Sequence, residues 1–149
     1  MNEIIRPIRE SEMDSLVQLC YDHAIFEESE YDSNGKAEKL HSFIFGERPV
    51  LVCLVAEIEG QLLGYITFTK EFSTWSAEYF YHMDCLYLKE EGRNLGLGKK
   101  LMNVMSEVAK QNDINHIQWQ TPESNQNAID FYHHIGASSK PKQRFFLNL

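Results

Sequence analysis

The stretch Arg93-Asn94-Leu95-Gly96-Leu97-Gly98-Lys99-Lys100-Leu101-Met102 decides the fold of this 149-residue chain. It follows an aromatic and aliphatic run at residues 80–88 that predicts a buried strand. Apolar residues then recur at 101, 102, 105, 108 and 109, which predicts one face of a helix. A strand that passes through a glycine loop into a helix leaves unpaired N–H groups at the positive end of the helix dipole. The stretch therefore predicts an anion site.

Two common phosphate loops do not fit this stretch. The dinucleotide motif fails because Leu101 stands where its third glycine is required, and the P-loop fails because Lys100, not Ser or Thr, follows Lys99. The remaining pattern, Arg93-x-x-Gly96-x-Gly98, resembles the acyl-CoA pyrophosphate loop of the GNAT N-acetyltransferase family. An ordinary strand-to-helix turn is the alternative interpretation of these residues.

Length and composition favour a single compact domain over residues 1–149. The acidic first thirty residues contain no apolar segment typical of a signal peptide or a spanning helix, so we expect a cytoplasmic protein that does not bind membranes. Three cysteines without C-x-x-C spacing favour reduced thiols and no metal site. A net charge of −8 argues against nucleic-acid binding and favours cationic ligands, although acidity can also serve solubility alone.

The hydrophobic pattern predicts alternating strands and helices. We expect a short edge strand at 4–9, a helix from Ser11 to about residue 26 with a capping-box-like Ser11-x-x-Asp14 pair, and a helix over 36–45 with Leu40, Phe43 and Ile44 inward. After these elements we expect a hairpin of strands at 50–57 and 62–69, and then the strand before the glycine loop and the long helix. A strand at 116–121 and a helix at 125–134 are expected next. Residues 137–138 and 144–149 are expected to complete the sheet.

A second motif, Asn125-Gln126-Asn127-Ala128-Ile129-Asp130-Phe131-Tyr132-x-x-x-Gly136-Ala137, is similar to the one that follows the fifth strand of the GNAT family. The resemblance covers nearly the whole chain and implies an α/β GNAT acyl-CoA N-acyltransferase fold, a mixed sheet of six to seven strands with helices on both faces. Arg6-Pro7, Phe26-Glu27, residues 53–57 and Trp75 look most like the spermidine/spermine and thialysine N-acetyltransferase branch.

The resemblance implies acetyl-CoA as co-substrate and assigns residues to it. Leu86, Tyr87 and Leu88 would pair with the pantetheine arm as an added strand would. The pyrophosphate would be held by the loop, residues Arg93, Asn94, Leu95, Gly96, Leu97, Gly98 and Lys99. The thioester end would contact the second motif through Asn125, Asn127 and Ala128.

The same resemblance assigns the chemistry. Tyr132 would protonate the departing thiolate as a general acid, and the alternative is an aromatic residue that only packs. Asp84, or a water relay, would remove the amine proton, and the alternative is a buried structural acid. Cys85 departs from the aspartate that the polyamine branch usually has at this position, which puts a polyamine preference in doubt.

We expect the substrate to be a small primary amine, bound by Phe26, Glu27, Asp84, Gln118 and Gln120. An acidic run at residues 27–32 can equally be a solvated loop. Acetylation of a protein lysine or N-terminus, and a non-catalytic acyl-CoA-binding module, are the rival functions. Like the polyamine branch, the chain is expected to form a homodimer, because its C-terminal Phe145-Phe146-Leu147 segment has few charges.

Overall fold

The computed structural model describes residues 2–149. The chain divides into two compact units, a first unit that ends at Trp119 and a second unit, Gln120–Leu149, which are described separately. No helix of the described residues is long and apolar enough to cross a membrane.

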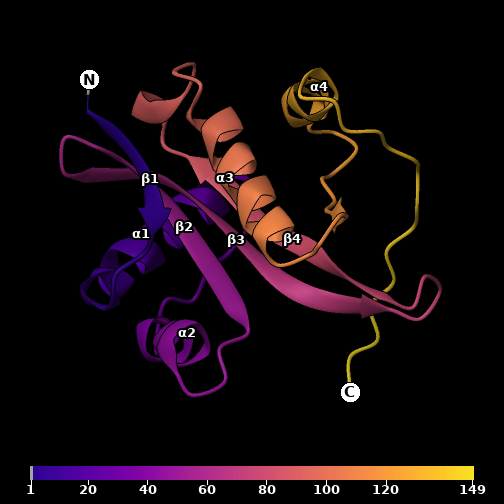
Figure 1. Cartoon of the computed structure of the whole chain (residues 1–149). Coiled ribbons are helices and arrows are strands. Elements are labelled where there is room, and N and C mark those ends of the chain that lie inside the picture. The colour runs from indigo at the N-terminus through magenta and orange to yellow at the C-terminus, as the bar shows by residue number, and fades with distance from the viewer. Residues whose placement is uncertain (1) are drawn as a thin grey trace. The chain divides into compact units, whose positions relative to one another are not determined.

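The first unit contains a sheet and three α-helices (Figure 1). In chain order its elements are β1 (Glu3–Pro7), η1 (Glu10–Glu12), α1 (Met13–Phe26), α2 (Lys36–Phe45), β2 (Leu51–Ile58), β3 (Gln61–Ser73), β4 (Glu78–Leu88), η2 (Glu90–Gly92), α3 (Leu97–Gln111) and β5 (Ile117–Gln118). Helix α2 has the predicted bounds, and β5 is shorter than the predicted strand at 116–121.

Within the described residues the sheet has five strands in the order β1-β2-β3-β4-β5. The first four are antiparallel neighbours, and β5 runs parallel to β4, so the sheet is mixed as predicted. Strand β1 lies at an edge, as expected for a strand that contains Pro7. The β2–β3 hairpin turns through Glu59 and Gly60, both at positive φ, which is the geometry of a tight hairpin turn.

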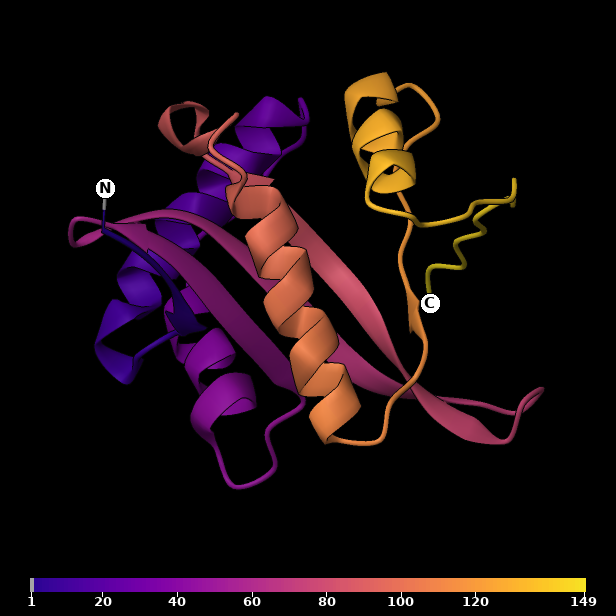
Figure 2. The same cartoon turned by 45° about the horizontal axis from the view of Figure 1, so that its top comes forward.

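Helices cover both faces of the sheet, which confirms the predicted layering (Figure 2). On one face α1 and α2 pack against Cys53, Val55, Tyr65 and Tyr87. On the other face α3 packs against β1 to β4 with Leu97, Leu101, Met102, Met105 and Ala109 buried. Successive residues of a strand point to opposite faces of the sheet. Leu54 and Val55 are adjacent on β2 and both are buried, so their side chains pack on opposite faces of the sheet.

Two local predictions for the helical layer were wrong. Ser11 lies inside η1 and does not cap α1; instead the Glu12 carboxylate accepts the Arg9 backbone N–H at 2.8 Å. The same carboxylate forms an ion pair with Arg6, so the Glu12 side chain binds the Arg9 backbone N–H and the Arg6 guanidinium at the same time. On α2, Leu40 and Ile44 pack inward as predicted, but Phe43 is 52% exposed and Phe45 packs in its place.

The second unit contains α4 (Gln126–His134), and its remaining residues have no regular secondary structure. The predicted strands at 137–138 and 144–149 are therefore absent, and the described sheet has five strands where six to seven were predicted. Phe145, Phe146 and Leu147 are each at least 74% exposed. An apolar and aromatic run resembles a strand in sequence, but a strand also requires a neighbour to pair with.

Candidate active site

The glycine loop joins β4 to α3 and places the exposed Gly96 at the N-terminus of the helix. After η2, Asn94 (φ 61°) and Gly96 (φ 77°) both adopt the left-handed conformation, and Gly96 is the N-cap of α3. The first N–H groups of any helix have no intrahelical acceptor, and Gly96 offers no side chain to cap them. The arrangement therefore leaves donors for an anion at this end of α3.

The three cations of the loop differ in what they contact. The Arg93 side chain donates from Nε to the Leu88 carbonyl at 3.0 Å and lies over the Phe26 ring, 4.4 Å from its centroid. Lys100 forms an ion pair with Glu3. Lys99 is exposed on the first turn of α3 and is the cation best placed to meet an incoming phosphate.

Strand β4 offers an open backbone edge next to this loop. Ten of its eleven residues pair with β3 along one side, but on the other side β5 pairs only with Tyr81 and His82 among the described residues. Leu86, Tyr87 and Leu88, predicted to pair with an extended ligand, lie beyond this contact. In the described sheet no strand occupies their outer edge, so a ligand that runs like a strand can pair there, with the Leu88 carbonyl already accepting from Arg93.

Asp84 is the extra residue of a β-bulge in β4. Cys85 pairs with Thr67 and Met83 pairs with Phe68, so Asp84 has no partner position on β3. The bulge exposes the Asp84 side chain, which excludes the alternative of a buried structural acid. Beside it the Thr67 hydroxyl is buried and has no hydrogen-bond partner among the described residues.

The thiol next to Asp84 is a poor nucleophile. Cys85 donates its Sγ–H to Asp84 Oδ2 across 3.6 Å. Burial, followed by the Asp84 carboxylate, raises the pKa of Cys85 to about 12. A thiol that stays protonated at neutral pH does not form a covalent acyl intermediate readily, so the site favours direct attack by a substrate nucleophile.

The end of α1 carries two predicted substrate contacts and a residue that the sequence did not single out. Phe26 is 56% exposed and its ring lies 6.2 Å from that of Tyr87. Glu27 is the C-cap of α1, and its carboxylate lies 3.2 Å from His23 Nε2. The i, i+4 spacing of His23 and Glu27 on a helix was the signal that sequence reasoning missed.

The second unit presents the other predicted motif on α4. Asn125 is the N-cap of α4, and its Oδ1 accepts the Ala128 backbone N–H at 3.3 Å. Asn127 is exposed on the first turn, and Tyr132 is half-buried with its ring 5.4 Å from that of Phe131. Asn125 thus has a structural role in starting the helix, and its amide nitrogen remains suited to donate to a ligand.

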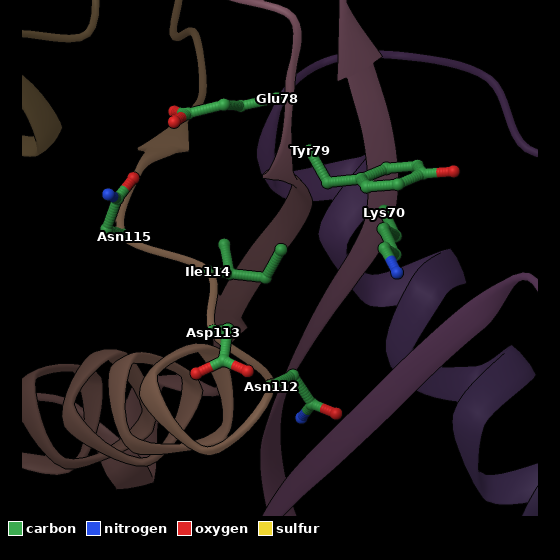
Figure 3. A pocket seen from close by; sticks show the side chains of 7 residues that line it. All are labelled: Lys70, Glu78, Tyr79, Asn112, Asp113, Ile114 and Asn115. Carbon is green, nitrogen blue, oxygen red and sulfur yellow. The ribbon is translucent and has the colours of Figure 1, made fainter.

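Two shallow hollows of the first unit lie away from the glycine loop. One, of about 320 Å³, is lined by residues of the α3 C-terminal end and the β3–β4 hairpin, among them Lys70, Tyr79 and Asp113 (Figure 3). The other, of about 550 Å³, includes Trp75 and Gln118. Helix α3 has 15 residues and is about 22 Å long. The hollow at its C-terminal end is therefore distinct from the glycine loop at its N-terminus.

The predicted substrate glutamines do not share one strand. Gln118 lies on β5, and its amide Nε2 donates to His116 Nε2 at 3.0 Å. Gln120 is exposed at the start of the second unit, outside any strand. Sequence reasoning had placed both on one strand from 116 to 121. The short pairing of β5 with β4, which ends at Gln118, is the reason for the difference.

Comparison with known proteins identifies the chain's relatives. The model of the Acetyltransferase (GNAT) family matches residues 11–137. Thialysine N-epsilon-acetyltransferase of Bos taurus is 30% identical over 142 residues, which cover 90% of this chain and 83% of the bovine protein. The Mus musculus protein of the same name is 28% identical, with 97% of this chain and 89% of the mouse protein covered.

Solved structures show the same fold at lower identity. A possible acetyltransferase from Clostridium difficile 630 has a TM-score of 0.84 at 19% identity, with 100% of this chain and 99% of that chain covered. An aminoglycoside acetyltransferase from an uncultured soil metagenomic sample has a TM-score of 0.85 at 18% identity, with 99% and 96% covered. These likenesses show the fold alone.

Proposed function

This chain belongs to the acetyltransferase (GNAT) family and is an N-acetyltransferase, and from that premise we propose that it transfers the acetyl group of acetyl-CoA to a primary amine of a small molecule. The observation that carries the proposal is the uncapped N-terminus of α3 behind the exposed Gly96, next to the open edge of β4. Enzymes of the GNAT family use acetyl-CoA as co-substrate.

The residues present fit the two parts of acetyl-CoA. Its pyrophosphate would be held by the N–H groups from Leu97 to Lys99 and by the Lys99 ammonium, because a Cβ at Gly96 would meet no atom within 4 Å and the space above the helix start is open. Its pantetheine amides would pair with the backbone of Leu86 to Leu88, which β5 leaves free. Asn125, Asn127 and Ala128 are proposed contacts from the second unit.

We propose that Asp84 receives the proton of the attacking amine, directly or through water. An alkyl amine has a pKa of about 10 in water, so it must lose a proton before its nitrogen can attack the thioester carbon. The bulge presents the Asp84 carboxylate to solvent at the point where β4 and β5 separate. The carboxylate can also balance the positive charge of the amine before transfer.

We propose Tyr132 as the general acid. When the amine nitrogen bonds to the acetyl carbon, the carbon–sulfur bond breaks and the electron pair leaves on sulfur. The Tyr132 hydroxyl would give its proton to that thiolate and be reprotonated from solvent. Cys85 does not compete as nucleophile, because its pKa is raised.

The substrate class is proposed from charge and from the relatives. Glu27 at the end of α1 and Asp84 at the bulge of β4 each carry a carboxylate, and the chain carries a net charge of −8, which suits an amine with more than one cationic group. Curated relatives include the thialysine enzymes, and an L-ornithine N5-acetyltransferase of Arabidopsis thaliana is 26% identical over 50% of this chain and 32% of the plant protein. We therefore propose a diamine or an amino acid with a side-chain amine, with Phe26, Gln118 and Gln120 as further contacts.

We also propose that both units act as one domain, because the family match spans them. A homodimer and a cytoplasmic location complete the proposal. The exposed Phe145, Phe146 and Leu147 support association, and the three free cysteines suit a reducing compartment.

The direct test is release of the CoA thiol from acetyl-CoA in the presence of a panel of amines. The panel should hold monoamines, diamines, lysine-like amino acids and a lysine-containing peptide. Turnover with a small diamine or amino acid, and little with the peptide, is the expected result. Turnover confined to the peptide would support protein acetylation, and acetyl-CoA binding without turnover would support a non-catalytic module.

A further inference from the structure

His23, in the last turn of α1, is fixed at three points. Its Nδ1 lies 2.8 Å from the Tyr65 hydroxyl and its Nε2 lies 3.2 Å from Glu27 Oε1. The ring is stacked on Tyr87, with centroids 5.0 Å apart and an interplanar angle of 17°. The side chain is only 15% exposed, so both nitrogens and one ring face are engaged by protein groups.

These contacts determine which ring nitrogen carries the proton when His23 is neutral. An ionised carboxylate only accepts hydrogen bonds, so Nε2 must donate to Glu27. Nδ1 then has a lone pair and accepts the Tyr65 O–H. Burial raises the pKa of Tyr65 far above its ordinary value, so this hydroxyl stays protonated and able to donate.

The same cluster joins the end of α1 to the glycine loop. Tyr87 is the penultimate residue of β4, and the Arg93 guanidinium lies 5.9 Å from the Tyr87 ring centroid and 4.4 Å from that of Phe26. His23 therefore links Glu27 to the strand that leads into the loop. Without the imidazole, the Glu27 side chain at the helix end would be free to rotate.

We propose that His23 is a positioning residue that holds the Glu27 carboxylate as the acceptor for the second, distal ammonium of a diamine substrate. This inference rests on the proposed function. A carboxylate has more acceptor sites than one N–H fills, so Glu27 can bind His23 and an ammonium at the same time. A monoamine has no distal ammonium, and its transfer does not depend on His23.

The test compares 1,4-diaminobutane with butylamine as substrates in the thiol-release assay. The variants are His23→Phe, which keeps an aromatic ring but removes both hydrogen bonds, Glu27→Gln, and the double variant. A matched control is His41→Phe, because His41 on α2 also faces a glutamate, Glu10 at 3.7 Å, and an aromatic ring but is 44% exposed.

We expect His23→Phe to raise the KM for the diamine about 2- to 10-fold, the range of one net hydrogen bond, and to leave kcat and the KM for butylamine unchanged. Because His23 acts through Glu27, the double variant should be no worse than Glu27→Gln alone. His41→Phe should match the wild type with both amines. A merely structural histidine would instead lower turnover of both amines alike.

Two results would overturn the inference: an equal loss with both amines, or additive losses in the double variant. If His23→Phe fails to fold, His23→Gln replaces it. Its amide can donate to Glu27 without the stacked ring, so both KM values should stay near those of the wild type, and a raised KM with both amines alike would count against the role. If the wild type acetylates no amine of the panel, the proposed function fails; if it acetylates neither 1,4-diaminobutane nor butylamine, calorimetry of diamine binding decides the inference. Equal affinity of wild type and His23→Phe, or no binding by the wild type, then rejects it.

Discussion

Replacing Gly96 with valine tests the anion site most directly, because its effect on folding stability can be distinguished from its effect on acetyl-CoA binding. Gly96 has φ 77° and ψ 8° at the N-cap of α3. A side chain in this left-handed conformation costs about 1–2 kcal/mol of folding free energy. Apart from the adjoining residues of the chain, no described atom lies within 4 Å of the added Cβ, so a clash adds nothing to this backbone cost.

Gly35 provides a matched control. It is the N-cap of α2 with φ 73° and ψ 2°, and a Cβ there also meets nothing within 4 Å. Gly35→Val and Gly96→Val should therefore lower the melting temperature by similar amounts, about 2–8 °C for a chain of this size. Differential scanning calorimetry measures both losses.

Acetyl-CoA affinity should separate the two variants. The valine at Gly96 would occupy the space through which a phosphate reaches the N–H groups of α3. Losing one hydrogen bond to a charged group costs about 1.5–3 kcal/mol, so the dissociation constant should rise at least about tenfold. Gly35→Val should bind acetyl-CoA as the wild type does. Titration calorimetry that finds both variants within twofold of the wild type would refute the anion site at this loop.

Four other measurements test the remaining assignments. Tyr132→Phe should lower kcat by about 10²–10⁴-fold without weakening acetyl-CoA binding, since only the hydroxyl is lost, and near-full turnover would make Tyr132 a packing residue. Asp84→Asn should raise the amine KM or move the pH–rate profile upward, because an amide cannot balance an ammonium; unchanged kinetics in both respects would reject Asp84 as base. The Arg6 guanidinium lowers the pKa of Glu12. The stabilisation that this pair gives to the folded state is therefore present above the unfolded pKa of Glu of about 4.3 and is lost as pH falls through the folded pKa. Wild-type melting temperature should thus fall more steeply than that of Glu12→Gln between about pH 5 and 3, and parallel curves would contradict this. Sedimentation at micromolar concentration should give a dimer, and a monomer alone would reject the proposed association.

Much of the fold was predictable because the decisive signals are local. The helical period at 101–109, the β-branched run of β2 and the tight turn at Glu59-Gly60 each encode their element within a few residues. The C-terminal segment shows the limit of this reasoning. Its apolar residues look like strand residues, but strand formation depends on a pairing partner, which a local pattern does not contain.

Some features of the candidate site were likewise local in sequence, and others were not. The glycine loop, the end of α1 and the second motif were recognisable from residue types and spacing. The cations of the loop were not distinguishable in sequence: only the structure pairs Lys100 with Glu3 and lays Arg93 over Phe26. Likewise, the hydroxyl that binds His23 Nδ1 belongs to Tyr65, which is 42 positions away in the chain.

By itself, the sequence determined the order of the elements from β1 to α4 and the glycine loop before α3, since glycine spacing and hydrophobic period act over neighbouring residues. Tertiary structure alone decided that Asp84 is the extra residue of a bulge, that β5 leaves the end of β4 open, and that His23 lies between Tyr65 and Glu27. Register and side-chain contacts depend on strands and helices distant in sequence, and a shift of one residue in pairing reverses the face to which every following side chain points.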